Sequence, residues 1–217
     1  MLQPESSALH TACSELGLIL SDDQATALLK YLALLQHWNA AYNLTAVRHP
    51  AAMLTQHLVD CLALVPPLLR QVGAGPVRIL DVGSGGGLPG VVLAIMVAKW
   101  GVTCVDAVGK KTAFVRQAAG ALDLVNLHAV HSRVENLRAP AFDVITVRAF
   151  GSLTATVSLT RKLIGLGPGA CWLAMKGKRP DEEIAALPDD IDVFHVEQLV
   201  VPGLDAQRCL VWMRPAA

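Results

Sequence analysis

Apolar positions follow two different periods along the chain. In the N-terminal third, Leu28, Leu32 and Leu35 recur at helical spacing. Just before them, Ser21 and Gln24 form the Ser-x-x-Gln pattern of a capping box, which predicts that a helix begins there.

A second helix is predicted over residues 57–65, after a polar interruption at residues 39–48. Pro66-Pro67 is expected to end it, because proline lacks the backbone N–H that a helix interior uses. Residues 1–20 are mixed in character and indicate no single element. Residues 1–76 are therefore expected to form a helical N-terminal extension.

From residue 77 onward, short apolar runs alternate with helical patterns, which predicts an α/β fold with a doubly wound sheet and right-handed crossovers. The expected strands are residues 77–82, 102–106, 127–130, 143–147, 170–175, 193–201 and 208–213. The expected helices are residues 89–98, 110–122, 152–164 and 181–187. The last two strands are close enough in sequence to pair as a hairpin, so the last strand should be antiparallel. Residues 77–217 are expected to form one compact Rossmann-like domain with a seven-stranded sheet.

A glycine-rich segment, Asp81-Val-Gly-Ser-Gly-Gly-Gly-Leu-Pro-Gly90, joins the first predicted strand to the first helix of this domain. Glycine accepts a positive φ and lets a ligand approach the main chain. The glycines concerned are Gly83, Gly85, Gly86 and Gly87. Pro89 suits the first turn of the helix, where its missing N–H is no loss.

Two classes of ligand use such a turn. Gly85-x-Gly87-x-x-Gly90 matches the dinucleotide fingerprint, which is a weak signal alone. Asp81 lies two positions before Gly83, and the resulting Asp-x-Gly-x-Gly-x-Gly resembles the first motif of class I S-adenosylmethionine-dependent methyltransferases. In that class the acid helps to hold the cationic methionine end of the donor, whereas it would repel a pyrophosphate. A tight turn without a ligand is the alternative.

The next two strands end in further candidate ligand contacts. Asp106 follows Gly83 by 23 residues, and its carboxylate is suited to accept hydrogen bonds from both hydroxyls of a ribose. The alternative is that Asp106 only caps the following helix. After the third strand, Val134 and Glu135 are candidates for recognising adenine, with a solvated surface charge as the alternative for Glu135.

The fourth strand ends in Thr146-Val-Arg148-Ala-Phe150, where methyltransferases usually place the residues that face the methyl group. No Asn/Asp-Pro-Pro-aromatic motif is present there, which disfavours transfer to the exocyclic amine of adenine. No cysteine is present there either, so covalent attack on a pyrimidine ring lacks its nucleophile.

Composition indicates a compact globular protein, with 53% hydrophobic and 17% charged residues. No apolar run approaches the ~20 residues of a membrane span and no export signal is evident, so a cytoplasmic location is expected. The five cysteines lack CxxC spacing and fit a reducing compartment. Cys104, Cys171 and Cys209 lie in apolar runs and are predicted to be buried thiols.

Charge is unevenly distributed, although the formal net charge is zero. Residues 99–179 carry twelve Lys and Arg against four Asp and Glu. A basic block that follows the ligand turn favours nucleic-acid binding. Ordinary solvated helix faces are the alternative.

Together these motifs resemble those of the bacterial small-subunit 16S rRNA guanine-N7 methyltransferases, the glucose-inhibited division protein B family. The resemblance runs from about Trp38 to Arg208. It is carried by Trp38-Asn-x-x-Tyr-Asn-Leu-Thr45, Arg48, His57-x-x-Asp60, Asp81 to Gly90, Asp106-x-x-x-Lys110-Lys111, Ser132-Arg-Val-Glu135, Arg148-Ala149, Ala174-Met-Lys-Gly177 and Arg208-Cys-Leu-Val211.

The resemblance implies a class I S-adenosylmethionine-dependent methyltransferase fold and methyl transfer to N7 of the guanosine at position 527 of 16S rRNA. The substrate would be the rRNA within the 30S subunit or an assembly intermediate; we expect a monomer, no metal and no membrane partner. The residues implied to contact the methyl donor are Asp81, Gly83, Gly85, Leu88, Asp106, Val134, Glu135 and Arg148. Those implied at the active-site mouth or on the RNA are Asn43, His57, Arg133, Arg148 and Lys176. Ala107 and Gly86 depart from the family pattern, where serine, and alanine or proline, are common.

The implied chemistry fits the absent motifs. Guanine N7 carries an in-plane lone pair and no proton, so it attacks the sulfonium methyl without a general base, and positioning dominates catalysis. Arg148 or Arg133 is expected to donate to guanine O6. A structural Arg148, paired with Glu135 or holding its loop, is the alternative. The rival functions are a small-molecule methyltransferase, a non-catalytic ligand-sensing or RNA-binding module, and a nicotinamide oxidoreductase.

Overall fold

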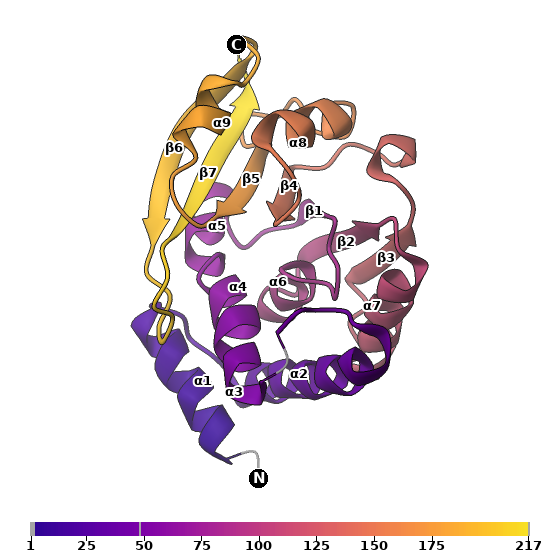
Figure 1. Cartoon of the computed structure of the whole chain (residues 1–217), viewed down its shortest axis with the longest axis vertical. Coiled ribbons are helices and arrows are strands. Elements are labelled where there is room, and N and C mark those ends of the chain that lie inside the picture. Colours follow the sequence, from indigo (N-terminus) through magenta and orange to yellow (C-terminus); the bar gives the residue numbers. More distant parts are fainter. Residues whose placement is uncertain (1–2, 48, 217) are drawn as a thin grey trace.

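One seven-stranded sheet forms the centre of the computed structural model, which describes residues 3–47 and 49–216 (Figure 1). Its strands are β1 (Val77–Val82), β2 (Trp100–Asp106), β3 (Leu127–His131), β4 (Val144–Arg148), β5 (Cys171–Lys176), β6 (Ile191–Leu199) and β7 (Arg208–Pro215). Their order in the sheet is β3-β2-β1-β4-β5-β7-β6. β7 pairs antiparallel with both β5 and β6, and the other pairs are parallel, which confirms the predicted antiparallel last strand.

Helices flank this sheet and precede it. The α-helices are α1 (Gln3–Glu15), α2 (Asp22–Tyr42), α3 (Pro50–Met53), α4 (Asp60–Leu62), α5 (Val65–Val72), α6 (Gly90–Met96), α7 (Gly109–Ala121), α8 (Leu153–Thr160) and α9 (Asp181–Ala185). A π-helical turn, η1 (Leu54–Val59), joins α3 to α4, and a 3-10 turn, η2 (Val134–Asn136), follows β3. The predicted capping box is confirmed, because the Gln24 N–H donates to Ser21 Oγ and the Ser21 N–H to Gln24 Oε1.

Two sequence predictions about prolines need correction. Pro66-Pro67 does not end a helix, because α5 begins at Val65 and carries both prolines in its first turn, where no intrahelical N–H is needed. Pro89 is the residue before α6 and not part of its first turn. Arg48, which contributes to the family resemblance, lies outside the described residues.

The N-terminal helices share a hydrophobic core with one face of the sheet. Leu28 and Leu35 of α2 belong to the same buried cluster as Val91 of α6 and Phe114 of α7. The opposite face of the sheet is covered by a second cluster, which includes Leu153 of α8. The division of the chain at residue 76 into an extension and a domain stays a prediction.

One helical run, Ala51–Val72, is long and apolar enough to cross a membrane by composition alone, with a mean hydropathy of 1.4. Of its apolar window, 67% is buried inside the fold, as in the core helix of a globular protein. The three predicted buried thiols, Cys104, Cys171 and Cys209, are confirmed as buried and unpaired. Burial raises the pKa of Cys171 to about 12.

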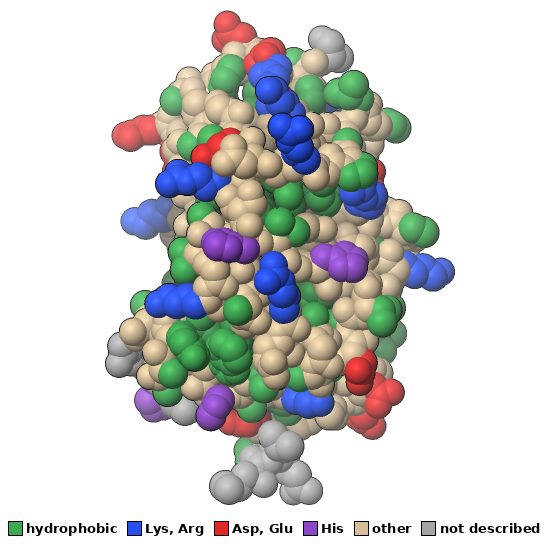
Figure 2. Space-filling view, turned by 90° about the vertical axis from the view of Figure 1, so that its right-hand side faces the viewer, with side chains coloured by type: hydrophobic (Ala, Val, Ile, Leu, Met, Phe, Trp, Pro, Cys, Tyr) green, Lys and Arg blue, Asp and Glu red, His purple; other side chains and the backbone are tan. Residues whose placement is uncertain are grey.

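Basic side chains are spread over the side of the molecule that carries α7 and β3. Lys and Arg side chains extend across this face, whereas Asp and Glu lie mainly toward its margins (Figure 2). Both elements belong to the basic segment 99–179 that the sequence singles out.

Candidate active site

Two adjoining cavities open at the carboxyl ends of the parallel strands. The first has a volume of about 510 Å³ and the second about 390 Å³. Gly83, Lys111 and Ala149 line both. The first is also lined by Leu35, Leu44, Thr45, Asp60, Ser84, Gly85, Gly86, Leu88, Arg148, Met175, Lys176, Gly177 and Arg208. The second is also lined by Val82, Val105, Asp106, Ala107, Ser132, Arg133, Val134, Glu135, Phe150 and Leu159.

The glycine turn forms the boundary between the cavities. Gly83, Gly85 and Gly87 have φ values of +64°, +58° and +89°, which favour glycine over any residue with a side chain. At Gly83 a Cβ atom would also lie 2.4 Å from Cδ2 of Phe150, so this ring packs directly on the glycine. At Gly85 a Cβ atom would meet open space, so the main chain there is accessible from the first cavity.

Gly86 has a different role from its neighbours, because α2 holds it. The Tyr31 hydroxyl donates to the Gly86 carbonyl at 2.7 Å, and a Cβ atom at Gly86 would lie 2.9 Å from Leu35 Cδ1. Gly86 is not among the residues with positive φ. Having glycine at position 86, where the family commonly has alanine or proline, therefore affects the packing of the turn against α2.

Asp81 is fully buried below the turn and lines neither cavity. Its Oδ2 accepts a hydrogen bond from the Gly90 N–H at 2.8 Å, at the start of α6. Its Oδ1 has no hydrogen-bonding partner among the described residues. Burial raises the pKa of Asp81 to about 7, against the opposing effect of the Gly90 N–H. The structure thus shows Asp81 holding the turn, and its contact with the methyl donor stays a prediction.

Asp106 lies on the wall of the second cavity and also holds the turn. Its Oδ2 accepts from the Gly85 N–H at 3.0 Å, and its Oδ1 accepts from the Val108 N–H at 2.8 Å. Each carboxylate oxygen keeps a second lone pair for a ligand hydroxyl. The residues present therefore fit a ribose at this point.

Val134, Glu135 and Arg133 lie together at the far wall of the second cavity. The Val134 side chain is buried, whereas the side chains of Glu135 and Arg133 are 42% and 74% exposed. Their charged groups are 3.8 Å apart. Arg133 is absent from the first cavity, which separates it from Arg148.

Arg148 pairs with Asp60, not with Glu135. Its Nη1 donates to the Gln56 carbonyl at 3.2 Å and to Asp60 Oδ2 at 3.4 Å. Asp60 Oδ1 accepts from Nε of Arg208 at 2.7 Å. Asp60, whose side chain is 3% exposed, therefore joins two guanidinium groups at the wall of the first cavity.

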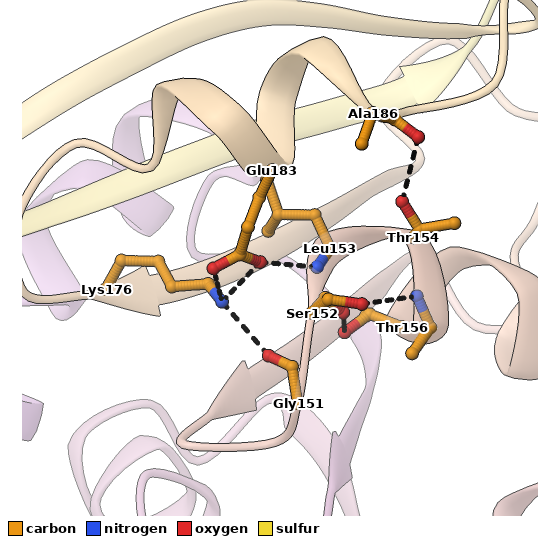
Figure 3. A network of polar contacts seen from close by, with 9 residues as sticks. Gly151, Ser152, Leu153, Thr154, Thr156, Lys176, Glu183 and Ala186 are labelled. Atoms are coloured by element: carbon orange, nitrogen blue, oxygen red, sulfur yellow. Dashed lines mark hydrogen bonds and ion pairs between the residues drawn. The ribbon is translucent and has the colours of Figure 1, made fainter.

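Lys176 lies at the rim of the first cavity, in the polar network of Figure 3. Its ammonium donates to both carboxylate oxygens of Glu183, at 2.8 and 3.0 Å, and to the Gly151 carbonyl at 3.0 Å. Glu183 also accepts from the Leu153 N–H at 2.8 Å. Through these contacts β5 and α9 hold the loop that follows β4.

His57 and Asn43, which the resemblance implies at the mouth, line neither cavity. His57 lies in the π-helical turn and is 4% exposed, and its Nε2 is 2.9 Å from Thr45 Oγ1. Burial, followed by the charge of Arg148, lowers the pKa of His57 to about 4, so the ring is neutral at pH 7. Asn43 is the exposed C-cap residue of α2.

Several residues of the first cavity were not assigned a role from the sequence. Thr45, Asp60 and Arg208 occur in the resemblance, but nothing local indicates that they meet. Leu35 and Leu44 read as ordinary core positions. A signal existed for Asp60, because a carboxylate in an apolar helix needs a buried partner.

Comparisons with known proteins show which family the chain belongs to. A family model described as GidB, rRNA small subunit methyltransferase G, matches residues 24–211. The ribosomal RNA small subunit methyltransferase G of Leptothrix cholodnii is 58% identical over 214 residues, covering 99% of this chain and 97% of the relative. The protein of the same name from Acidovorax sp. is 57% identical over 218 residues, covering 97% of this chain and 95% of the relative.

Solved structures of lower identity share the fold. TrmN from Thermus thermophilus matches with a TM-score of 0.55 and 20% identity, covering 75% of this chain and 53% of its own. Magnesium protoporphyrin IX methyltransferase from Synechocystis, solved with bound S-adenosylmethionine, matches with a TM-score of 0.60 and 11% identity, covering 85% and 97%. The predicted class I methyltransferase fold is confirmed.

Proposed function

Because the chain belongs to the GidB family, described as rRNA small subunit methyltransferase G, we propose that it methylates N7 of a guanosine in 16S rRNA with S-adenosylmethionine as donor. The resemblance of its motifs places that guanosine at position 527. We further propose that it acts in the cytoplasm as a monomer, on the 30S subunit or an assembly intermediate, without a metal ion.

The observation that carries this proposal is the pair of adjoining cavities that share Gly83 and Ala149. A nucleoside in the second cavity would have its ribose on Asp106 and its base near Val134 and Glu135. The methionine part would then cross the glycine turn into the first cavity. There the sulfonium supplies the electrophilic methyl group, and the remaining space is open to an acceptor base.

The chain's own residues support an acceptor that needs no general base. Asp60 is the one carboxylate among the described residues that line the first cavity, and two arginines already engage it. His57 is buried, with its pKa lowered to about 4, mainly by burial. Guanine N7 fits such a site, because its lone pair attacks directly and leaves no proton to remove. The task of the protein is then orientation and exclusion of water.

Arg148 suits the orienting role better than Arg133. Arg148 lines the first cavity with its side chain 24% exposed, and Asp60 and the Gln56 carbonyl fix its Nη1. A guanidinium held in this way donates its remaining N–H groups in a defined direction, which suits guanine O6. Arg133 lines only the nucleoside side, where the charge of Glu135 lies nearby.

Mass spectrometry of 16S rRNA from cells with and without this protein tests the proposal. N7-methylguanosine at one site should disappear with the protein and return when the wild-type chain is restored. Purified enzyme given either 30S particles or naked 16S rRNA should then show which form is methylated. Unchanged N7-methylguanosine in cells, together with methylation of a small molecule in vitro, would favour a small-molecule methyltransferase.

A further inference from the structure

The basic residues that line the first cavity differ in whether a carboxylate neutralises them. Lys176 is neutralised by Glu183, and Lys111 lies 3.9 Å from Asp106. Arg148 and Arg208 share the single carboxylate of Asp60. Asp81 also interacts with Arg148, but it is buried below the turn and does not line the cavity. Among the described residues on the cavity wall, the arginine pair therefore has one positive charge more than it has carboxylate partners.

This surplus charge is poorly suited to the guanine base alone. Methyl transfer to N7 moves a positive charge from the donor sulfur to the base, so a cationic partner beside the ring gains nothing from the reaction. A phosphodiester group of the RNA strand is an anion throughout. The arginine that is less engaged in orienting the base is thus expected to meet a phosphate.

We infer that Arg208 binds a backbone phosphate of the rRNA next to the target guanosine, and that Asp60 is the positioning residue that aims its guanidinium. This rests on the proposed function. Arg208 is the first residue of β7, with its side chain 25% exposed at the cavity wall. Asp60 fixes its Nε, and its own neighbour Gln207 accepts from Nη1 at 2.9 Å. Its Nη2 forms no hydrogen bond within the described part of the chain, which leaves that N–H pair for a ligand oxygen.

The fold explains how the two arginines come to share one carboxylate. Asp60 directly follows the π-helical turn, and the same turn presents the Gln56 carbonyl to Arg148. Turns of this kind recur at functional sites, because the extra residue redirects neighbouring groups. Arg148 ends β4 and Arg208 begins β7, on opposite sides of β5. The antiparallel direction of β7 brings its first residue to the edge where the parallel strands end.

The test compares Arg208→Gln with Arg214→Gln in the full-length enzyme. Arg214 is a matched control on the same strand, paired with Asp192 at 2.7 Å and absent from the first cavity. We expect Arg208→Gln to raise the KM for unmethylated 30S particles by about ten-fold or more. The slope of log(kcat/KM) against log salt should become shallower by about one. Donor affinity, measured calorimetrically, should stay within about two-fold. Arg214→Gln should change none of these.

Two further variants separate positioning from charge. Asp60→Asn weakens the contacts of both Arg208 and Arg148 but keeps their charges, so kcat/KM should fall while the salt slope stays at least as steep as in the wild type. Arg208→Lys keeps the charge without the Nε contact and should restore the salt slope but not the KM. Melting temperatures show that each variant is folded.

The outcomes distinguish this inference from the proposed function. If wild-type enzyme does not methylate the particles, the proposed function fails. If wild-type enzyme methylates them and Arg208→Gln retains its KM and salt slope, the phosphate contact is wrong. A weakened donor affinity in Arg208→Gln would instead assign Arg208 to the donor carboxylate and overturn the inference.

Discussion

The two cavities are built in different ways. The second takes most of its walls from the ends of β1, β2, β3 and β4 and the loops that directly follow them, with Lys111 of α7 and Leu159 of α8 added. The first shares the glycine turn after β1 and is otherwise assembled mainly from α2 and the segment after it, α4, and the ends of β4, β5 and β7. Asp60 meets Arg148 and Arg208 across 88 and 148 positions of the chain. The second cavity, proposed to hold the nucleoside, is therefore local in sequence, whereas the first, proposed to receive the acceptor, depends on contacts between distant segments.

The two cavities also differ in the charged side chains that line them. The second presents the paired side chains of Arg133 and Glu135 and the carboxylate of Asp106, which suit the hydroxyls and ring nitrogens of a nucleoside. The first carries the arginine pair with its surplus positive charge, which suits a polyanion. Under the proposed function, the second cavity would hold the nucleoside part of the donor and the first would receive the RNA.

Of the variants considered, Arg148→Ala should have the largest effect on the activity that depends on the first cavity. Methylation of 30S particles is expected to fall on the order of a thousand-fold, because an orienting donor is lost. The free energy of unfolding should also fall by about 2 kcal/mol, since Asp60 keeps one partner of two. Single-turnover assays and urea denaturation measure both quantities. Arg116→Ala, on the exposed face of α7, is the control; wild-type turnover in Arg148→Ala would refute the assigned role.

Gly83→Ala should disturb both cavities, because this glycine lines both. Gly17→Ala is the matched control, with a φ of +69° against +64° but open space around its Cβ. Both variants carry the strain of a positive φ, of about 1 kcal/mol. At Gly83 the overlap with Phe150 should add about 2 kcal/mol and weaken donor binding. Equal stability losses in the two variants would show that the Phe150 ring moves aside without a measurable loss of stability.

Asp106→Asn should weaken the nucleoside side alone. We expect donor affinity to fall by about ten-fold, because charge-assisted hydrogen bonds to the ribose become neutral ones. Calorimetric titration with S-adenosylmethionine measures this, and Asp205→Asn, at an exposed position, is the control. The KM for RNA should be nearly unchanged at saturating donor. An unaltered donor affinity would limit Asp106 to holding Gly85.

Glu183→Gln tests the network in Figure 3 and should have a smaller effect. The variant removes the ion pair with Lys176 but keeps an acceptor for the Leu153 N–H. We expect a loss of about 0.5–1 kcal/mol in stability and a few-fold fall in kcat/KM for RNA. Asp181→Asn, on the same helix and paired with exposed Arg179, should change neither. A loss equal to that of Arg148→Ala would place Lys176 in the catalytic machinery.

Asp81 introduces a pH dependence of the free energy of unfolding. Because its folded pKa is raised to about 7, mainly by burial, its contribution to stability is present below about pH 4 and is lost as the pH rises to about 7. Asp81→Asn removes this contribution. Relative to the wild type, the variant should therefore gain stability as the pH rises from about 4 to about 7 in denaturation experiments. Parallel curves for the two proteins would show that Asp81 keeps an ordinary pKa.

The sequence predicts those parts of the site that depend on short-range patterns. The glycine turn, Asp106 and the strand that ends at Arg148 follow from apolar periodicity and turn chemistry, which act over a few residues. The partner of Arg148 does not follow, because Asp60 approaches it only after α4 packs across the strand ends. Pro66-Pro67 shows the same limit. Proline is compatible both with the end of one helix and with the first turn of the next, so the local sequence does not decide between them.

The hydrogen bond between Tyr31 and Gly86 has a consequence for how the chain is made. The ribosome synthesises α2 before any strand, yet the partner of this hydroxyl lies 55 positions further along. Until α6 and α7 emerge, Leu28 and Leu35 lack the helices that complete their buried cluster. α2 is thus made before the turn that it holds, and its contact with Gly86 can form only after that turn has been synthesised.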